Sequence, residues 1–111
     1  MTVSTLKDAL GLTLLTRGGD LEREVAGAYC GDLLSWVMGR APTDGAWLTI
    51  MSNRNVAAVA EMADLSCVIL CEGVSPDPEL LERAESEGLP LLQTQEDTFT
   101  AAGRLYLLLR P

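Results

Sequence analysis

Three short polar segments contain the residues of this sequence that could bind a ligand. They are residues 52–55 (Ser-Asn-Arg-Asn), residues 72–75 (Glu-Gly-Val-Ser) and residues 94–98 (Thr-Gln-Glu-Asp-Thr). Each follows a short apolar run typical of a buried strand and precedes a helix-forming stretch. Hydroxyl, amide and guanidinium groups at such a junction, together with the free amides of a helix N-terminus, suit an anion such as a phosphate.

Arg54 makes the first segment the most informative. If Ser52 or Asn53 caps the following helix, Arg54 falls in the first helical turn, where a cation opposes the helix dipole by about 0.3–1 kcal/mol. One interpretation is that Arg54 and the neighbouring amides face a bound anion. The other is that Arg54 is solvated or pairs with one of the sixteen carboxylates, since surface ion pairs are common.

The other two segments also have structural explanations. A glycine after a strand, such as Gly73, often serves only a backbone with positive φ, and Asp97 or Thr98 can cap the helix that follows. If the three strands are neighbours in a parallel sheet, however, all three segments meet at the edge where α/β proteins bind ligands. The candidate site therefore consists of Ser52, Asn53, Arg54, Asn55, Gly73, Thr94, Asp97 and Thr98.

The sequence lacks the residue types of many catalytic and metal sites. It contains no histidine, which is the commonest general base and imidazole ligand, and no glycine-rich phosphate-binding loop with its lysine. Cys30, Cys67 and Cys71 do not have metal-ligand spacing, and the last two, in one strand, lie roughly 13 Å apart, too far for a disulfide. We expect buried, reduced cysteines and no catalytic residue, cofactor or metal. An enzyme that uses Cys71, Asp97 or Arg54 is the alternative.

Length and charge narrow the classes of partner. A chain of 111 residues with 48% apolar residues can form one compact core without disulfides, and we predict a single domain over residues 1–111. The net charge of −8 repels nucleic acids and anionic membranes. No apolar run approaches the roughly 20 residues of a membrane span, and the N-terminus lacks a signal-peptide pattern. We therefore expect a cytoplasmic protein.

Strands and helices alternate regularly in the second half of the chain. Strands over residues 47–50, 67–70 and 89–94 are followed by helices over residues 55–63, 78–87 and 98–109. The middle helix has Asp77 as its N-cap and Gly88 just past its end. Apolar strands with such short connections predict right-handed crossovers. The expected fold is α/β, a single three-layer domain with a mainly parallel sheet covered by helices on both faces.

The first half of the chain is less regular. Ser4 can cap a helix over residues 5–10 that Gly11 ends. Residues 12–16 have the composition of a strand, and residues 21–30 alternate weakly, as an extended segment does.

Two helices are expected to face inward with large apolar side chains. Asp32 is the predicted N-cap of a helix over residues 33–40, with Leu33, Trp36 and Val37 in the core. In the helix over residues 98–109, the inward positions are Phe99, Ala102, Leu105, Tyr106 and Leu109.

Three stretches of the sequence resemble the DRTGG domain, a small α/β module related to the N-terminal domain of HPr kinase/phosphorylase. They are AGAYCGDLLSWVM, WLTIMSNRNVAAVA and LPLLQTQEDTFTAAGRLY, and the resemblance covers about residues 3–110. The Asp-Arg pair of the family's name corresponds to Asn53-Arg54, which keeps the arginine. The Thr-Gly-Gly triplet corresponds to Cys71-Glu72-Gly73, which keeps only the last glycine.

The resemblance implies a regulatory or accessory module, often fused to CBS domains or placed beside catalytic domains, and usually a homodimer. HPr kinase chemistry belongs to a separate phosphate-loop domain and does not carry over. We expect a non-catalytic module that binds a small anionic ligand, a nucleotide or a phosphorylated metabolite, at the candidate site. The alternative is a dimerisation or interaction subunit of a larger enzyme or signalling system, without a ligand, whose interface contains Tyr29, Trp36 and Met38.

Overall fold

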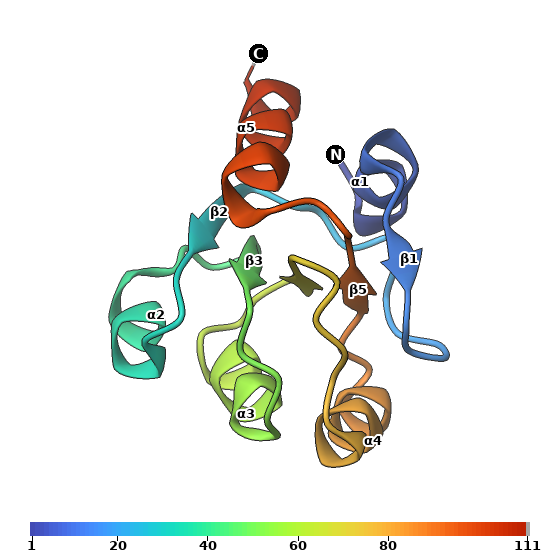
Figure 1. Ribbon diagram of the computed structural model, residues 1–111, viewed down its shortest axis with the longest axis vertical. Helices are drawn as coiled ribbons and strands as arrows, with labels where there is room; N and C mark the ends of the chain where they lie inside the picture. The colour runs from blue at the N-terminus through green and yellow to red at the C-terminus, as the bar shows by residue number, and fades with distance from the viewer. Residues whose placement is uncertain (111) are drawn as a thin grey trace.

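The computed structural model describes residues 1–110 and has a five-stranded sheet between two layers of helices (Figure 1). The strands are β1 (Thr13–Leu14), β2 (Gly27–Cys30), β3 (Gly45–Thr49), β4 (Cys67–Leu70) and β5 (Leu91–Gln93). Their spatial order is β1-β5-β4-β3-β2. Strands β2 to β5 run parallel, and β1 pairs with β5 in the antiparallel direction. The predicted α/β fold with a mainly parallel sheet is confirmed.

Helices cover both faces of this sheet, as predicted. Helices α1 (Val3–Leu10) and α5 (Thr98–Leu109) lie on one face, and α2 (Leu34–Arg40), α3 (Asn55–Met62) and α4 (Pro78–Glu87) lie on the other (Figure 1). Within residues 1–110, no helix is long and apolar enough to cross a membrane.

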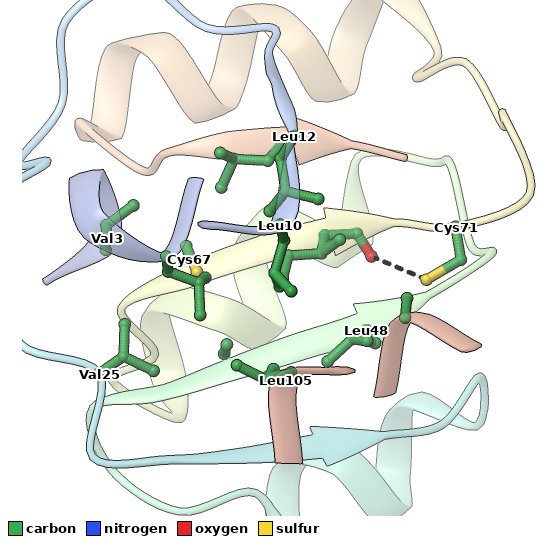
Figure 2. Packing of buried hydrophobic residues seen from close by; sticks show 13 residues of the cluster. Val3, Leu10, Leu12, Val25, Leu48, Cys67, Cys71 and Leu105 are labelled. Carbon is green, nitrogen blue, oxygen red and sulfur yellow. Dashed lines mark hydrogen bonds between the residues drawn. The ribbon is translucent and has the colours of Figure 1, made fainter. Parts of the chain in front are cut away.

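The strands divide their side chains between two buried clusters, one beneath each helix layer. On β3, Leu48 packs in the cluster beneath α1 and α5, whereas Trp47 packs in the cluster beneath the other three helices. Figure 2 shows the first cluster, which joins Leu10 of α1, Leu105 of α5 and Cys67 of β4. Every residue of β3 and β4 is buried, because these central strands are covered on both faces.

Boundaries in the second half of the chain agree closely with the predictions. Strand β4 and helices α4 and α5 have the predicted limits. Gly88 ends α4 with a left-handed backbone (φ 69°), the conformation that favours glycine after a helix. Strand β3 begins and ends earlier than predicted, β5 is shorter at both ends, and α3 ends one residue earlier.

The N-cap predicted for the first helix is wrong. Helix α1 begins at Val3, and its cap is Thr2 rather than Ser4, since the Thr2 hydroxyl accepts a hydrogen bond from the Thr5 amide at 3.1 Å. The cause is tertiary. Thr2 forms a β-bridge with Glu24, which holds it in the extended conformation that an N-cap requires.

The predicted cap of the second helix is also wrong. Helix α2 follows Leu33, whose backbone is extended, and Asp32 does not cap it. Asp32 Oδ1 instead accepts hydrogen bonds from Thr49 Oγ1 at 2.8 Å and from the Ile50 amide at 3.0 Å. Because β2 lies next to β3, the Asp32 carboxylate reaches the end of that strand more readily than the helix.

Several apolar side chains predicted to be buried are exposed. Of the predicted inward positions, Val37 and Leu105 are buried, but Leu33, Trp36, Phe99 and Tyr106 are 59%, 52%, 88% and 62% exposed. Cys67 and Cys71 are buried as expected, whereas Cys30 is exposed. Cys30 lies on β2, which ends the sheet on one side. Helices α2 and α5 pack near β2, and within the described residues no further strand lies beyond it to cover their outer sides (Figure 1).

Arg23 joins two turns at the N-terminal ends of the central strands. Its guanidinium donates to Asp44 Oδ1 through Nε (3.1 Å) and Nη2 (2.7 Å), and Nη2 also donates to Asp64 Oδ1 (2.8 Å) and to the Asp64 carbonyl (2.9 Å). Asp44 precedes β3 and Asp64 lies before β4, and both have positive φ (61° and 55°). Few residues other than glycine adopt this conformation, so the cation stabilises two unusual turns together.

We expect Arg23→Met to lower the free energy of unfolding by about 1.5–3 kcal/mol, the usual contribution of a hydrogen bond to a charged group. Urea denaturation followed by circular dichroism measures the change. The matched control is Arg17→Met, which removes the same charge from an exposed arginine. The hydrogen bond between Arg17 and Glu85, at 2.7 Å, comes from the Arg17 backbone amide, so the substitution leaves it in place. If both variants lost equal stability, net charge rather than the Arg23 contacts would be responsible.

Candidate functional site

The three polar segments lie at the same edge of the sheet. Strands β3, β4 and β5 run parallel, so the segments that follow them share one end. Backbone hydrogen bonds join these loops: the Gly73 amide donates to the Thr94 carbonyl, and the Asp77 amide donates to the Ser52 carbonyl, both at 2.9 Å. The geometry therefore brings the candidate residues together at the carboxyl ends of the strands.

Residues 52–55 form the turn into α3. Asn53 Oδ1 accepts a hydrogen bond from the Asn55 amide at 2.9 Å, a local turn that satisfies one of the first amides of the helix. The N-cap of α3 is Arg54 and not Ser52 or Asn53, so the predicted cap is wrong and Arg54 lies just before the first helical turn. Its backbone angles are helical, and its side chain makes no capping hydrogen bond. Its guanidinium is on the same end of the sheet as the loops after β4 and β5.

Arg54 has a partner in this structure. Its Nη1 lies 3.3 Å from Glu79 Oε2 of α4, and the two side chains are 65% and 69% exposed. This is the ion pair that the sequence left open as an explanation. Exposed pairs contribute about 0–1 kcal/mol, so the guanidinium can exchange Glu79 for another anion at little cost. An open groove of about 380 Å³, lined by Arg54 and by residues of α4, lies beside the pair.

Gly73 has a structural role in this edge. Its φ is 67°, and a Cβ at this position would lie 2.5 Å from Gln95 Oε1. Gln93 also holds the loop after β4, since its Nε2 donates to the Val74 carbonyl at 2.9 Å. The positive φ favours glycine here, as its structural explanation proposed. The two glutamines were not predicted, because side chains that contact a backbone across a sheet leave no local pattern.

The segment 94–98 uses most of its polar groups locally. Thr94 is buried, and its Oγ1 accepts from the Glu96 amide at 3.2 Å. Asp97 is the N-cap of α5, and its Oδ1 accepts from the Thr100 amide at 2.7 Å. This hydrogen bond lowers the pKa of the Asp97 carboxyl, since the amide stabilises the charged form. Thr98 begins α5.

Acidic side chains outnumber basic ones in the segments that form this edge. Asp32, Glu72, Asp77, Glu96 and Asp97 all follow the carboxyl ends of β2, β4 or β5. Asp32 was missed as a member of the site, although its place just after a parallel strand could have indicated it. An anionic ligand must therefore depend on Arg54 and on backbone amides rather than on the general field of the edge.

The three residues predicted for an interface do not form one surface. Tyr29 is half-buried and packs against the cluster beneath α2, α3 and α4. Trp36 and Met38 are exposed, but residues two apart on a helix point to different sides. The guanidinium of Arg40 stacks on the Trp36 ring at 3.8 Å from its centroid.

Comparisons with known proteins agree with this architecture. The model of the DRTGG domain family matches residues 5–108. Among solved structures, the CBS and DRTGG domains of the regulatory region of Clostridium perfringens pyrophosphatase, complexed with the activator diadenosine tetraphosphate, are similar with a TM-score of 0.74. That likeness covers 94% of this chain and 45% of the other, at 17% identity, and shows a shared fold. No curated protein matches the chain.

The lowered pKa of Asp97 gives a pH-dependent prediction. A carboxyl whose pKa falls on folding stabilises the protein above its unfolded pKa, and this stabilisation is lost as the pH drops through the folded pKa. We expect the melting temperature of Asp97→Asn to lie below that of the wild type at pH 7. The difference should shrink as the pH falls below about 4.

Thermal denaturation between pH 7 and pH 3 measures the effect. The control is Glu82→Gln on the exposed side of α4, which removes one carboxylate that caps no helix. A deficit in Asp97→Asn that stayed constant down to pH 3 would show that the charge of the cap does not contribute.

Proposed function

The chain belongs to the DRTGG domain family, and we propose that it is a regulatory or accessory module that responds to a small anionic ligand. The convergence of the turn containing Arg54 with the loops after β4 and β5 is the observation that carries this proposal. The proposal includes a single domain over residues 1–111, a cytoplasmic location and a homodimeric state.

The ligand that we propose is a nucleotide or a phosphorylated metabolite bound at the carboxyl edge of the sheet. Helices α3, α4 and α5 all begin at this edge, and free helix amides attract anions. The ion pair of Arg54 with Glu79 is exposed, so its guanidinium is available at little cost. In the similar pyrophosphatase structure, the regulatory region binds diadenosine tetraphosphate, which is an anion of this class.

A catalytic role has less support. Burial raises the pKa of the Cys71 thiol and raises that of Cys67 to about 12, so both stay protonated at neutral pH and are poor nucleophiles. Asp97 is engaged as a helix cap and Arg54 in an ion pair. Turnover that Cys71→Ser abolished would contradict a non-catalytic role.

A thermal-shift series with ATP, diadenosine tetraphosphate and inorganic phosphate tests the ligand. A ligand at 100 times its dissociation constant should stabilise the wild type by about 2.7 kcal/mol. Arg54→Met should lose most of this shift. Without ligand it should stay within about 1 kcal/mol of the wild type, because the pair with Glu79 is exposed.

Arg17→Met is the control, since it removes the same charge near β1, away from the candidate residues. It should keep the full ligand shift. The ligand proposal fails if none of the three anions shifts the wild type, or if Arg54→Met responds as strongly as the wild type does.

The second candidate function is an interaction subunit without a ligand. The exposed apolar side chains of α2 and α5 favour it, because large exposed apolar groups often mark protein interfaces. The interface predicted around Tyr29, Trp36 and Met38 belongs to this candidate. A domain that dimerised but bound none of the three anions would support it.

A further inference from the structure

An apolar groove of about 620 Å³ lies between β2 and one flank of α5. Ala28 and Cys30 of β2 line it on one side, and Phe99, Gly103 and Tyr106 of α5 line it on the other. This groove is separate from the polar segments of the candidate site. It contains most of the apolar groups that the sequence predicted to be buried and that are in fact exposed.

The groove exists because the upper helix layer does not cover the whole sheet. Only α1 and α5 lie on this face among the described residues (Figure 1). Helix α5 is held toward α1 on its other flank, where Arg104 Nη1 donates to the Leu10 carbonyl at 3.4 Å. Strand β2 at the margin of the sheet is therefore left open on this side, and its Ala28 and Cys30 are exposed.

An open edge of this kind is unfavourable for a protein that stays alone. Strand β2 pairs with β3 on one side and ends the sheet on the other. Unpaired edges carry a risk of aggregation, and proteins usually limit it with very short edge strands, charged residues, proline or a covering element. The strand sequence Gly-Ala-Tyr-Cys has no charge and no proline. Its short length of four residues is the protection that the strand itself provides, and a covering element would add to it.

Gly103 gives independent support for a close partner. Glycine within a helix costs about 0.8–1.0 kcal/mol relative to alanine, and a Cβ at this position would meet nothing within 4 Å in the described part of the chain. The fold of one copy therefore does not require this glycine. Phe99, Gly103 and Tyr106 are spaced so that they share one side of α5, which makes a dip between two aromatic rings that are 88% and 62% exposed.

The charge of the groove indicates what could occupy it. The chain carries a net charge of −8, so two copies repel each other over most of their surface. Among residues 1–110, no carboxylate lines the groove and its charged residue is Arg110, whose guanidinium lies 5.3 Å from the centre of the Tyr106 ring. An acid-free surface suits a partner with the same negative charge, and a second copy is such a partner.

We propose that this groove is the interface of a symmetric homodimer in which α5 of each copy packs over Gly103 and covers β2 of the other. The same patch offers both the projecting rings and the dip between them, which is what a two-fold interface requires. The inference rests on the homodimeric state in the proposed function and assigns it a surface other than that of Trp36 and Met38.

Sedimentation equilibrium across micromolar concentrations, with substituted chains, tests the assignment. The wild type should sediment at twice the chain mass of 11.9 kDa. Gly103→Gln should raise the dimer dissociation constant by about tenfold or more, because it fills the groove in both copies. Its circular dichroism should stay native, since the new side chain points into open space and glutamine favours helices more than glycine does.

Two control variants separate this surface from others. Met62→Gln changes an apolar side chain on α3 that is 70% exposed, and Trp36→Gln changes the surface on α2. Both should remain dimeric. A second readout is maleimide labelling of Cys30 at pH 8, because it is the exposed thiol among the three cysteines. Labelling should slow as wild-type concentration rises and should not slow in Gly103→Gln.

The outcomes distinguish the surface from the dimer itself. If the wild type is a dimer and Gly103→Gln dimerises equally well, the assignment to this groove is overturned and the homodimer stands. If the wild type stays monomeric throughout, the homodimeric part of the proposed function fails with it. Neither result affects the ligand test, which follows anion binding at the other site.

Discussion

Burial of the central strands on both faces is the constraint from which the other features follow. Because β3 and β4 expose no residue, their backbone groups must pair with neighbouring strands, and each chain crossing must pass over the sheet as a helix. Because the strands are parallel, the polar turns that follow β3, β4 and β5 all lie at the same end of the sheet. Arg54 and the loops near Gly73 and Thr94 meet for this reason, whatever their function. The opposite end receives the turns that Arg23 joins.

The half of the chain governed by this constraint was also the half that could be predicted. Apolar runs such as 67–70, and the proline and glycine that bound α4, are local signals with a direct structural meaning. Prediction failed where a residue far away in the sequence determines the local structure. Thr2 rather than Ser4 caps α1 because Glu24 pairs with it, and no local pattern distinguishes two hydroxyl residues so close together.

The candidate site shows the same division. That the three segments meet follows from strand order and could be predicted, but their partners could not. The pair of Arg54 with Glu79 and the contacts of Asp32 with the end of β3 join residues far apart in the sequence. Helical periodicity also fails at the margin of the sheet. It places Phe99 and Tyr106 on a common side of α5, but it cannot tell whether that side meets the sheet or extends beyond it.

The contacts of Arg23 make two turns in the middle of the chain depend on an earlier segment. Strands β3 and β4 pair with strands that lie well apart in the sequence, and the turns at Asp44 and Asp64 gain their cation only when the chain near residue 23 docks. The N-terminal third is therefore needed to complete the central turns. During synthesis, residue 23 leaves the ribosome before residues 44 and 64, so Arg23 cannot form these ion pairs until both aspartates have been made. A chain shortened past Arg23 would keep two aspartates in uncommon turns without this counter-ion.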